Sequence, residues 1–225
     1  MNQFRPILRG VAALAGVDVQ EIPDHFFRSL RDLATTRLGW VWDAAQFPET
    51  VATVAVAFVS GVAAVPNGYQ SVIEILDDDP DETLAADSLP FVRTGDNIRC
   101  PRAASTTCYV RLKKTAPVLE GDVYDATSTY VTGAQCYYLH SFWTFSGTWA
   151  AQVPGTDAEW VEVVIPARLN AYVKYGTLAD ILRTRGAAGD EVNGAEMLAD
   201  GAVDLELTKL NNGEGQFTKT KILTR

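Results

Sequence analysis

The chain has 225 residues, of which 47% are hydrophobic and 21% are charged, and its formal net charge at pH 7 is -9. This composition is ordinary for a folded protein and excludes a wholly disordered chain. The negative charge excludes long-range attraction to nucleic acid or anionic lipid, and no apolar run approaches the roughly 20 residues of a membrane span, so we expect a soluble protein without membrane contact.

Two amphipathic helices are predicted in the first fifty residues. Residues 6–17 carry apolar side chains at helical spacing and reach a helix-ending glycine at Gly16. A second helix covers about 24–42, and Phe47-Pro48 stops it. Its apolar stripe contains Phe26, Phe27, Leu30, Leu33, Ala34 and Leu38. On the opposite, polar face we expect Arg28, Arg31, Asp32 and Arg37.

The middle of the chain predicts short strands, because β-branched residues recur there between turn signals such as Pro66-Asn67-Gly68. The expected strands cover residues 51–59, 69–76, 91–94, 108–113, 136–145 and 160–165. Glycine and proline separate them, as in a sheet built of short strands.

Two further helices are predicted near the end, over about 166–186 and 190–210. Pro166 suits a first helical turn, where its missing N–H costs little. The apolar positions of the last helix are Val192, Ala195, Leu198, Ala202, Leu205 and Leu207. Between the packed helices we expect four buried leucines: Leu30, Leu33, Leu178 and Leu182.

The order of these elements predicts an α+β fold. Helices from residues 1–50 and 164–212 are expected to form one bundle, with 51–163 as a large β-rich insertion and 213–225 as an extended C-terminal arm.

Catalytic chemistry is not signalled by the sequence. His25 and His140 are the two histidines, and no serine stands in a G-x-S-x-G nucleophile elbow. The three cysteines, Cys100, Cys108 and Cys136, are too widely spaced for a zinc site or a disulfide framework. We therefore expect no enzyme activity, no cofactor and no metal, while a catalytic site assembled from distant residues stays a competing interpretation.

An acidic loop, defined by Asp77, Asp78, Asp79, Asp81 and Glu82, follows the second predicted strand. Its alternating aspartates match the first ligands of an EF-hand calcium loop. The match fails at the sixth position, which is Glu82 instead of glycine, and at the twelfth, which is Ser88 instead of glutamate. We expect a solvated loop that binds no metal.

Three segments resemble head-to-tail adaptor proteins of tailed bacteriophages. The first runs from Phe26 to Leu33, ends in Trp40-Val41-Trp42, and passes through Phe47-Pro48 into strands. The second, Val65 to Tyr69, is similar to the family's Pro-x-x-Tyr lead into a strand, and the third, Ile165 to Val173, is similar to its proline-initiated helix. Residues 100–149 match nothing in that family.

The resemblance implies a structural virion protein at the neck between head and tail, made in the bacterial cytoplasm. Its members form a ring, dodecameric in the family, that binds the portal and a downstream tail or nozzle protein. DNA passes through the lumen without sequence-specific binding, and the acidic loop is a candidate for the channel wall. The alternative is another virion component, a tail-tip or decoration protein with a β-rich binding region.

The last ten residues are basic in an otherwise acidic chain. The candidate binding residues for the portal, or for a neighbouring subunit, are Phe217, Lys219, Lys221, Ile222, Leu223 and Arg225. They follow a glycine-bracketed hinge at 213–215. An arm that orders on its partner is one interpretation, and a solvated terminus is the other.

Overall fold

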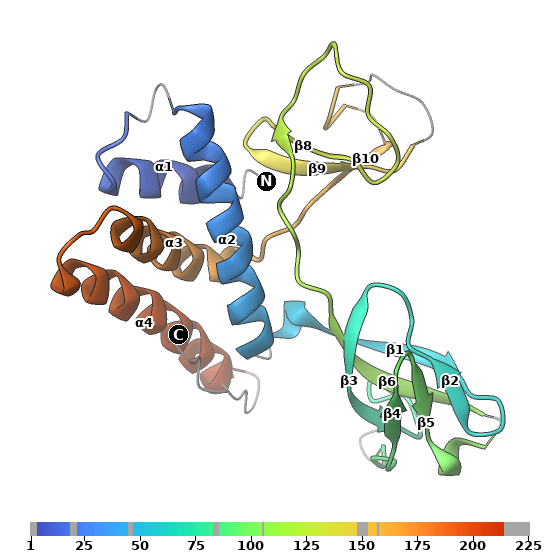
Figure 1. Ribbon diagram of the computed structural model, residues 1–225. Helices are drawn as coiled ribbons and strands as arrows, with labels where there is room; N and C mark the ends of the chain where they lie inside the picture. The colour runs from blue at the N-terminus through green and yellow to red at the C-terminus, as the bar shows by residue number, and fades with distance from the viewer. Residues whose placement is uncertain are drawn as a thin grey trace. The chain divides into compact units, whose positions relative to one another are not determined.

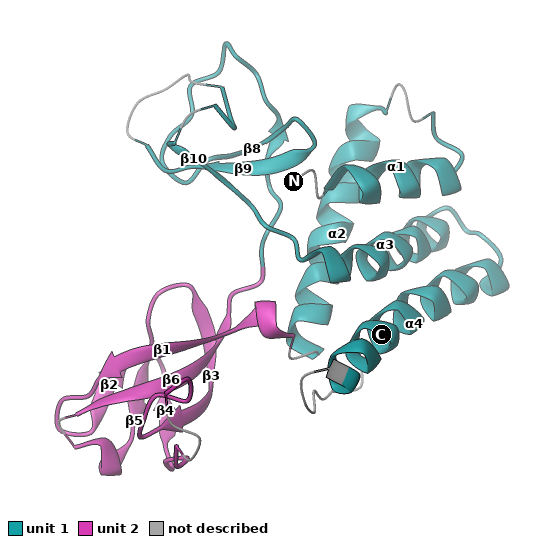
Figure 2. Cartoon of the chain, turned by 180° about the vertical axis from the view of Figure 1, so that it is seen from behind, with its two compact units in different colours: residues 1–45, 117–225 teal, residues 46–116 magenta. Residues whose placement is uncertain are grey.

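The computed structural model describes residues 4–18, 22–44, 47–82, 86–104, 106–147, 153–156 and 158–213, and it confirms an α+β fold. The chain forms two compact units: residues 1–45 with 117–225, and residues 46–116 (Figure 2). The candidate arm residues from Phe217 to Arg225 lie outside the described residues. None of the described helices combines the length and apolar character needed to cross a bilayer.

Helices from both ends of the chain pack together in the first unit (Figure 1). They are α1 (Phe4–Leu14), α2 (Asp24–Ala44), α3 (Asn170–Thr184) and α4 (Gly189–Gly213), with the 3-10 turn η3 (Ala167–Leu169) before α3. Helix α3 packs against each of the other three. The C-terminal helices are therefore integral to the core that the N-terminal helices begin.

Glycine ends both α1 and α3 by the same local geometry. Gly16 and Gly186 have φ angles of 69° and 71°, which a residue without a Cβ adopts readily. After α3, the N–H of Gly186 bonds to the carbonyl of Arg183 and that of Ala187 to the carbonyl of Leu182. The equivalent pair follows α1, so a Schellman motif satisfies the last carbonyls of both helices.

A small sheet, ordered β10-β9-β8-β7, belongs to the same unit. Its strands are β7 (Asp122–Val123), β8 (Gln135–Tyr138), β9 (Ser141–Phe145) and β10 (Trp160–Glu162). Phe4 and Phe27 of the helices contact Tyr137 and Phe142 of the sheet, with ring centroids 4.9–6.2 Å apart. This aromatic cluster joins the sheet to the helices.

The single strand expected over residues 136–145 is a hairpin. Leu139 and His140 form its two-residue turn with φ angles of 45° and 75°, the positive values that a type I′ turn requires. Neither is the glycine or asparagine that normally signals such a turn, so the sequence contains no local indication that the strand is interrupted here.

The second unit contains two three-stranded antiparallel sheets. One, ordered β1-β6-β3, consists of β1 (Val51–Ala57), β6 (Thr107–Lys114) and β3 (Tyr69–Leu76). The other, ordered β2-β5-β4, consists of β2 (Val62–Ala64), β5 (Asn97–Arg99) and β4 (Val92–Thr94). Turns η1 (Pro48–Thr50) and η2 (Pro101–Ala103) precede β1 and β6. Its core includes Val56, Phe58, Ile75, Ile98, Val110 and Leu112.

The stretch 51–163, expected as one β-rich insertion, is divided between the units. Its first part, up to residue 116, forms a unit with its own core. Its second part carries the rings that pack on α1 and α2. The second part is also richer in aromatic residues, and its long-range contacts with α1 and α2 place it with the helices.

Two of the four leucines expected in the helical core, Leu30 and Leu178, are buried. Leu33 and Leu182 are half-buried at its margin. The helical period therefore predicted which faces of α2 and α3 are packed, but it did not predict which leucines on those faces are fully buried.

Candidate assembly surface

A buried arginine fixes α4 against α2 and α3. Arg37, expected on the polar face of its helix, has a side chain only 2% exposed. It lies in line with Leu30, Ala34 and Val41, at the spacing of a single helical face. Its burial corrects the sequence prediction, which assigned the residue by charge instead of by position along the helix.

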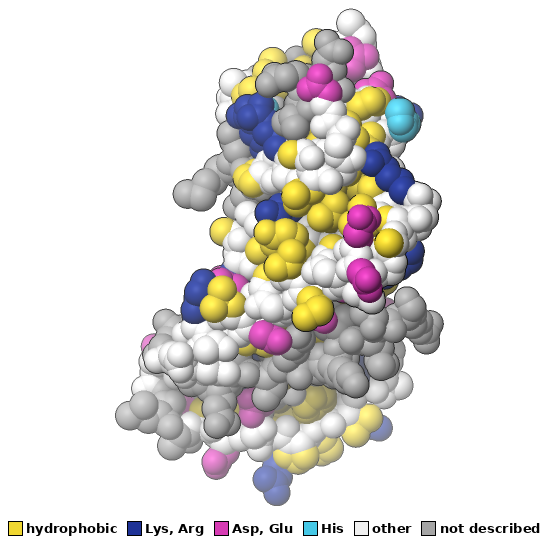
Figure 3. Space-filling model, turned by 90° about the vertical axis from the view of Figure 1, so that its left-hand side faces the viewer, with side chains coloured by type: hydrophobic (Ala, Val, Ile, Leu, Met, Phe, Trp, Pro, Cys, Tyr) yellow, Lys and Arg dark blue, Asp and Glu magenta, His cyan; other side chains and the backbone are white. Residues whose placement is uncertain are grey.

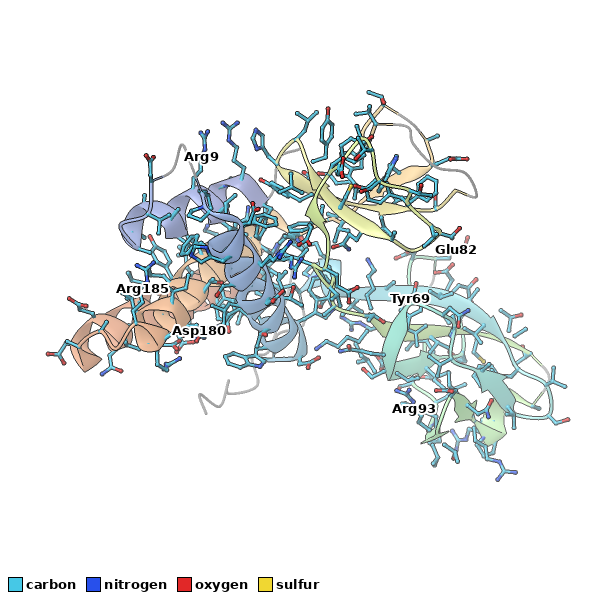
Figure 4. The ribbon with its side chains drawn as sticks, turned by 45° about the horizontal axis from the view of Figure 1, so that its top comes forward. Arg9, Tyr69, Glu82, Arg93, Asp180 and Arg185 are labelled. Atoms are coloured by element: carbon cyan, nitrogen blue, oxygen red, sulfur yellow. The ribbon has the colours of Figure 1, made fainter. Side chains whose placement is uncertain are left out.

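Two carboxylates surround the Arg37 guanidinium. Asp180 of α3 accepts from Nε and Nη2, both at 2.6 Å, and Glu196 of α4 accepts from Nη1 at 3.0 Å and Nη2 at 2.7 Å. Arg183 also donates to Asp180 at 2.8 Å and to Glu196 at 3.0 Å. The two arginines balance the two carboxylates, as buried charges require. Asp180 is labelled in Figure 4.

The charges of this network outweigh the effect of burial. Burial raises the pKa of Glu196, but hydrogen bonds and charges of Arg37 and Arg183 lower it further, so the net pKa lies below its usual range. Burial lowers the pKa of Arg37, whereas its bonds to Asp180 and Glu196 raise it above the ordinary value. Gly176 leaves the space needed, because a Cβ there would lie 2.9 Å from Cδ of Arg37.

Helix α4 buries a stripe different from the predicted one. The buried positions are Val192, Ala195, Ala199, Val203, Leu207 and Leu210. Leu198 and Leu205, expected inside, are 55% and 56% exposed, and Met197 is 75% exposed. Three large apolar side chains therefore lie on the face of α4 turned away from the core.

Two glycines lie on this same exposed face. Gly194 and Gly201 are seven residues apart, as are Leu198 and Leu205. A Cβ at either glycine would meet nothing within 4 Å. A glycine inside a helix costs about 0.8–1.0 kcal/mol relative to alanine, so the packing of this chain does not account for them. We call Gly194, Met197, Leu198, Gly201 and Leu205 the outer stripe.

The outer stripe has the composition of a helix-packing surface. Small residues let a second backbone approach closely, and leucines one turn away fill the spaces beside it. Exposed acidic residues flank the stripe, namely Asp190, Glu191 and Asp204. In Figure 3, hydrophobic side chains reach the surface of the helical unit between charged ones.

The acidic loop of the second unit is held by its own carboxylates. Oδ1 of Asp77 accepts from the N–H of Asp87 at 2.8 Å, and Oδ1 of Asp79 accepts from that of Asp81 at 2.9 Å. Asp78 accepts from the N–H of Asp79, and Glu82 is exposed (labelled in Figure 4). Within the described ranges, no three His, Cys, Asp or Glu side chains are grouped to hold a metal ion.

The candidate nucleophiles and bases are not brought together. His25 is exposed in the first turn of α2, and His140 is half-buried in the β8–β9 turn. Cys100, Cys108 and Cys136 are buried and free. Burial raises the pKa of Cys136 to about 12, so its thiol stays protonated, and therefore poorly nucleophilic, at neutral pH.

A surface pocket between α2 and α3 is lined by His25, Phe26, Ser29, Ile181, Thr184 and Arg185. The Arg185 guanidinium already donates to the carbonyl of Ala15 and lies 5.8 Å from the ring centre of Phe26. Its charge therefore serves the junction of α1, α2 and α3 and is not directed at a ligand.

Comparison of the sequence with models of protein families and with curated proteins finds no match. The outer stripe, which the sequence analysis did not identify, has no role in the packing of the described residues. Its signal was present in the seven-residue spacing of both its glycines and its leucines.

Proposed function

We propose that this chain is a structural subunit, a head-to-tail adaptor of a tailed bacteriophage that assembles with copies of itself into a ring between portal and tail. The observation that carries the proposal is the outer stripe. Helix α4 is packed on one face and fixed by the Arg37 network, yet it exposes Met197, Leu198 and Leu205 on the other. A rigid apolar helix face of this kind suits binding to another helix.

The virion setting is supported by the resemblance. Its landmarks coincide with junctions between elements: Phe47-Pro48 leads from α2 towards β1, Pro66 precedes β3, and Pro166 precedes α3. Residues of this kind at such junctions set the direction of the chain.

A contact through the outer stripe is small, and its repetition around a ring would strengthen the assembly. Fully burying a leucine contributes about 1.5–3 kcal/mol. Because Leu198 and Leu205 are 55% and 56% exposed, a contact can add only about half of that for each, so one contact is weak. In a closed ring every subunit takes part in two contacts, and loss of one subunit breaks both.

Charge agrees with a DNA channel. The net charge of -9 lets DNA slide past without adhering. The acidic loop is our candidate for the channel wall.

The test is negative-stain microscopy with mass photometry of the purified chain, alone and mixed with portal-bearing capsids of its phage. We expect rings, either free or on the portal vertex. Leu198→Glu with Leu205→Glu should abolish them. The matched control is Leu14→Glu, on α1, because Leu14 is 54% exposed and Leu198 is 55% exposed.

A chain that is monomeric alone and does not bind capsids contradicts the adaptor function. Rings formed by the double variant as readily as by the control contradict the role of the outer stripe.

A further inference from the structure

The sheet β1-β6-β3 has two edges of different character. Strand β3 is irregular, with register shifts between Tyr69 and Ser71 and between Val72 and Glu74. A crossing segment also covers its end, since Leu76 bridges to Ser88 and the N–H of Leu89 bonds to the carbonyl of Ile75. Glu74 is the charged residue of β3. Bulges, a charged residue and a covering segment are devices by which natural sheets protect an edge.

Strand β1 has none of these devices. Its seven residues pair with β6 in unbroken register, from Val51 opposite Lys113 to Ala57 opposite Thr107. The sequence Val-Ala-Thr-Val-Ala-Val-Ala contains no charge and no proline. Within the described part of the chain, no strand pairs with its outer edge.

Side chains of β1 also leave that edge accessible. Thr53, Ala55 and Ala57 are exposed and small. An uncharged, regular and uncovered edge presents backbone N–H and C=O groups to an incoming strand. Such an edge is an acceptor for strand addition.

We propose that β1 accepts the C-terminal segment of a second copy of this chain as an added strand. The segment Phe217–Thr224 alternates as a strand should. One face carries only β-branched residues, namely Thr218, Thr220, Ile222 and Thr224. The other carries Phe217, Lys219, Lys221 and Leu223. Threonine and isoleucine favour the extended conformation.

Length and charge fit the proposal. Twelve residues follow Gly213, where α4 ends, and β1 needs seven partners. The last ten residues hold Lys219, Lys221 and Arg225 and no acidic residue, so the rest of the chain carries -9 minus 3, or -12. The segment is therefore attracted to the body of any copy.

A second copy is the chosen donor because the inference rests on the proposed function. A ring needs a heterologous contact, in which one surface of a subunit meets a different surface of the next. A C-terminal donor and a β1 acceptor supply two such surfaces. Docking on the same chain, or on the portal, is an alternative that the experiment separates.

The experiment is cross-linking between two differently tagged full-length chains. One carries Ala55→Cys in β1, the other carries Thr220→Cys, and a short bifunctional maleimide joins thiols that lie close together. The native cysteines are buried, so they react slowly. The matched control replaces Ala55→Cys with Ser71→Cys, which is on β3, the other edge of the same sheet.

We expect a cross-linked heterodimer with Ala55→Cys and little with Ser71→Cys. A synthetic peptide of residues 216–225 should suppress it, and the same peptide with proline in place of Thr220 should not. Equal cross-linking at both edges overturns the proposal. A single chain that carries both Ala55→Cys and Thr220→Cys tests docking on the same chain. If cross-links form only within that chain and not between chains, the proposal is also overturned.

The adaptor function is judged separately, by microscopy of the same samples. Rings without the heterodimer refute strand addition and leave the adaptor standing. The heterodimer without rings or capsid binding supports strand addition and refutes the adaptor. If neither forms, both are wrong.

Discussion

Two regions of α4 reverse the usual distribution of polar and apolar groups. On its inner side Glu196 joins a cluster of four charged residues around the buried Arg37, and on its outer side Met197, Leu198 and Leu205 are exposed. Every member of the charged cluster has its partner within the chain. The outer stripe has no packing partner among the described residues. Contacts within the chain therefore explain the buried charges of α4, whereas its exposed apolar side chains point to contact with another molecule.

The largest effect is expected at the charged cluster. Arg37→Met removes the cation from between Asp180 and Glu196 and, among the described residues, leaves them the ion pairs with Arg183. Breaking a buried pair costs about 3–5 kcal/mol of unfolding free energy, measurable by urea denaturation.

The control is Arg28→Met, because Arg28 and Asp122 form an ion pair with 58% and 54% of their side chains exposed. That change should cost at most about 1 kcal/mol. Similar losses in the two variants would contradict the special status of the Arg37 cluster.

The second test compares two leucines of the helical unit. Leu178→Ala, at the buried contact of α3 with α4, should cost about 2–5 kcal/mol because it leaves a cavity. Leu205→Ala on the outer stripe should change the unfolding free energy by less than about 0.5 kcal/mol. An unchanged melting curve for Leu178→Ala would show that the helix faces are assigned wrongly.

Measuring stability at several pH values tests how much the charge of Glu196 contributes to the charged cluster. The folded pKa of Glu196 is lowered relative to about 4.3 in an unfolded chain. Its contribution to stability is therefore present above that pH and is lost as the pH falls through the folded pKa.

Because Arg37 supplies much of this effect, the stability gap between wild type and Arg37→Met should narrow on going from pH 7 to about pH 3. Urea midpoints at several pH values measure the gap. A gap that stays constant over this range would mean that the charge of Glu196 does not contribute.

The smallest effect is a stabilisation. Gly201→Ala adds a methyl group where nothing lies within 4 Å, so the isolated chain should gain about 0.5–1 kcal/mol. The same methyl group should weaken self-association if a second helix packs against this glycine. Thermal melting and mass photometry of the same variant separate the two effects.

Gly176→Ala is the control, since its Cβ would approach Cδ of Arg37 to 2.9 Å. It should destabilise the chain. If Gly201→Ala strengthens or preserves assembly, the glycines of the outer stripe are not there for close helix packing.

Local signals in the sequence were sufficient for most element positions. The expected strand 69–76 is β3, and the helix expected from Asp24 is α2. Glycine termination, proline position and side-chain period act within a few residues, so they can be read without knowledge of the fold. The stripe glycines and leucines of α4 were also visible, although the sequence did not distinguish their face from the packed one.

Contacts between distant residues decided the remainder. Arg37 is buried because Asp180 and Glu196, 143 and 159 residues further along, reach it. The sheet β7 to β10 belongs with the helices because Tyr137 and Phe142 meet Phe4 and Phe27. The free energy of burying a charge or a ring depends on which groups surround it after folding, and a linear pattern does not contain that information.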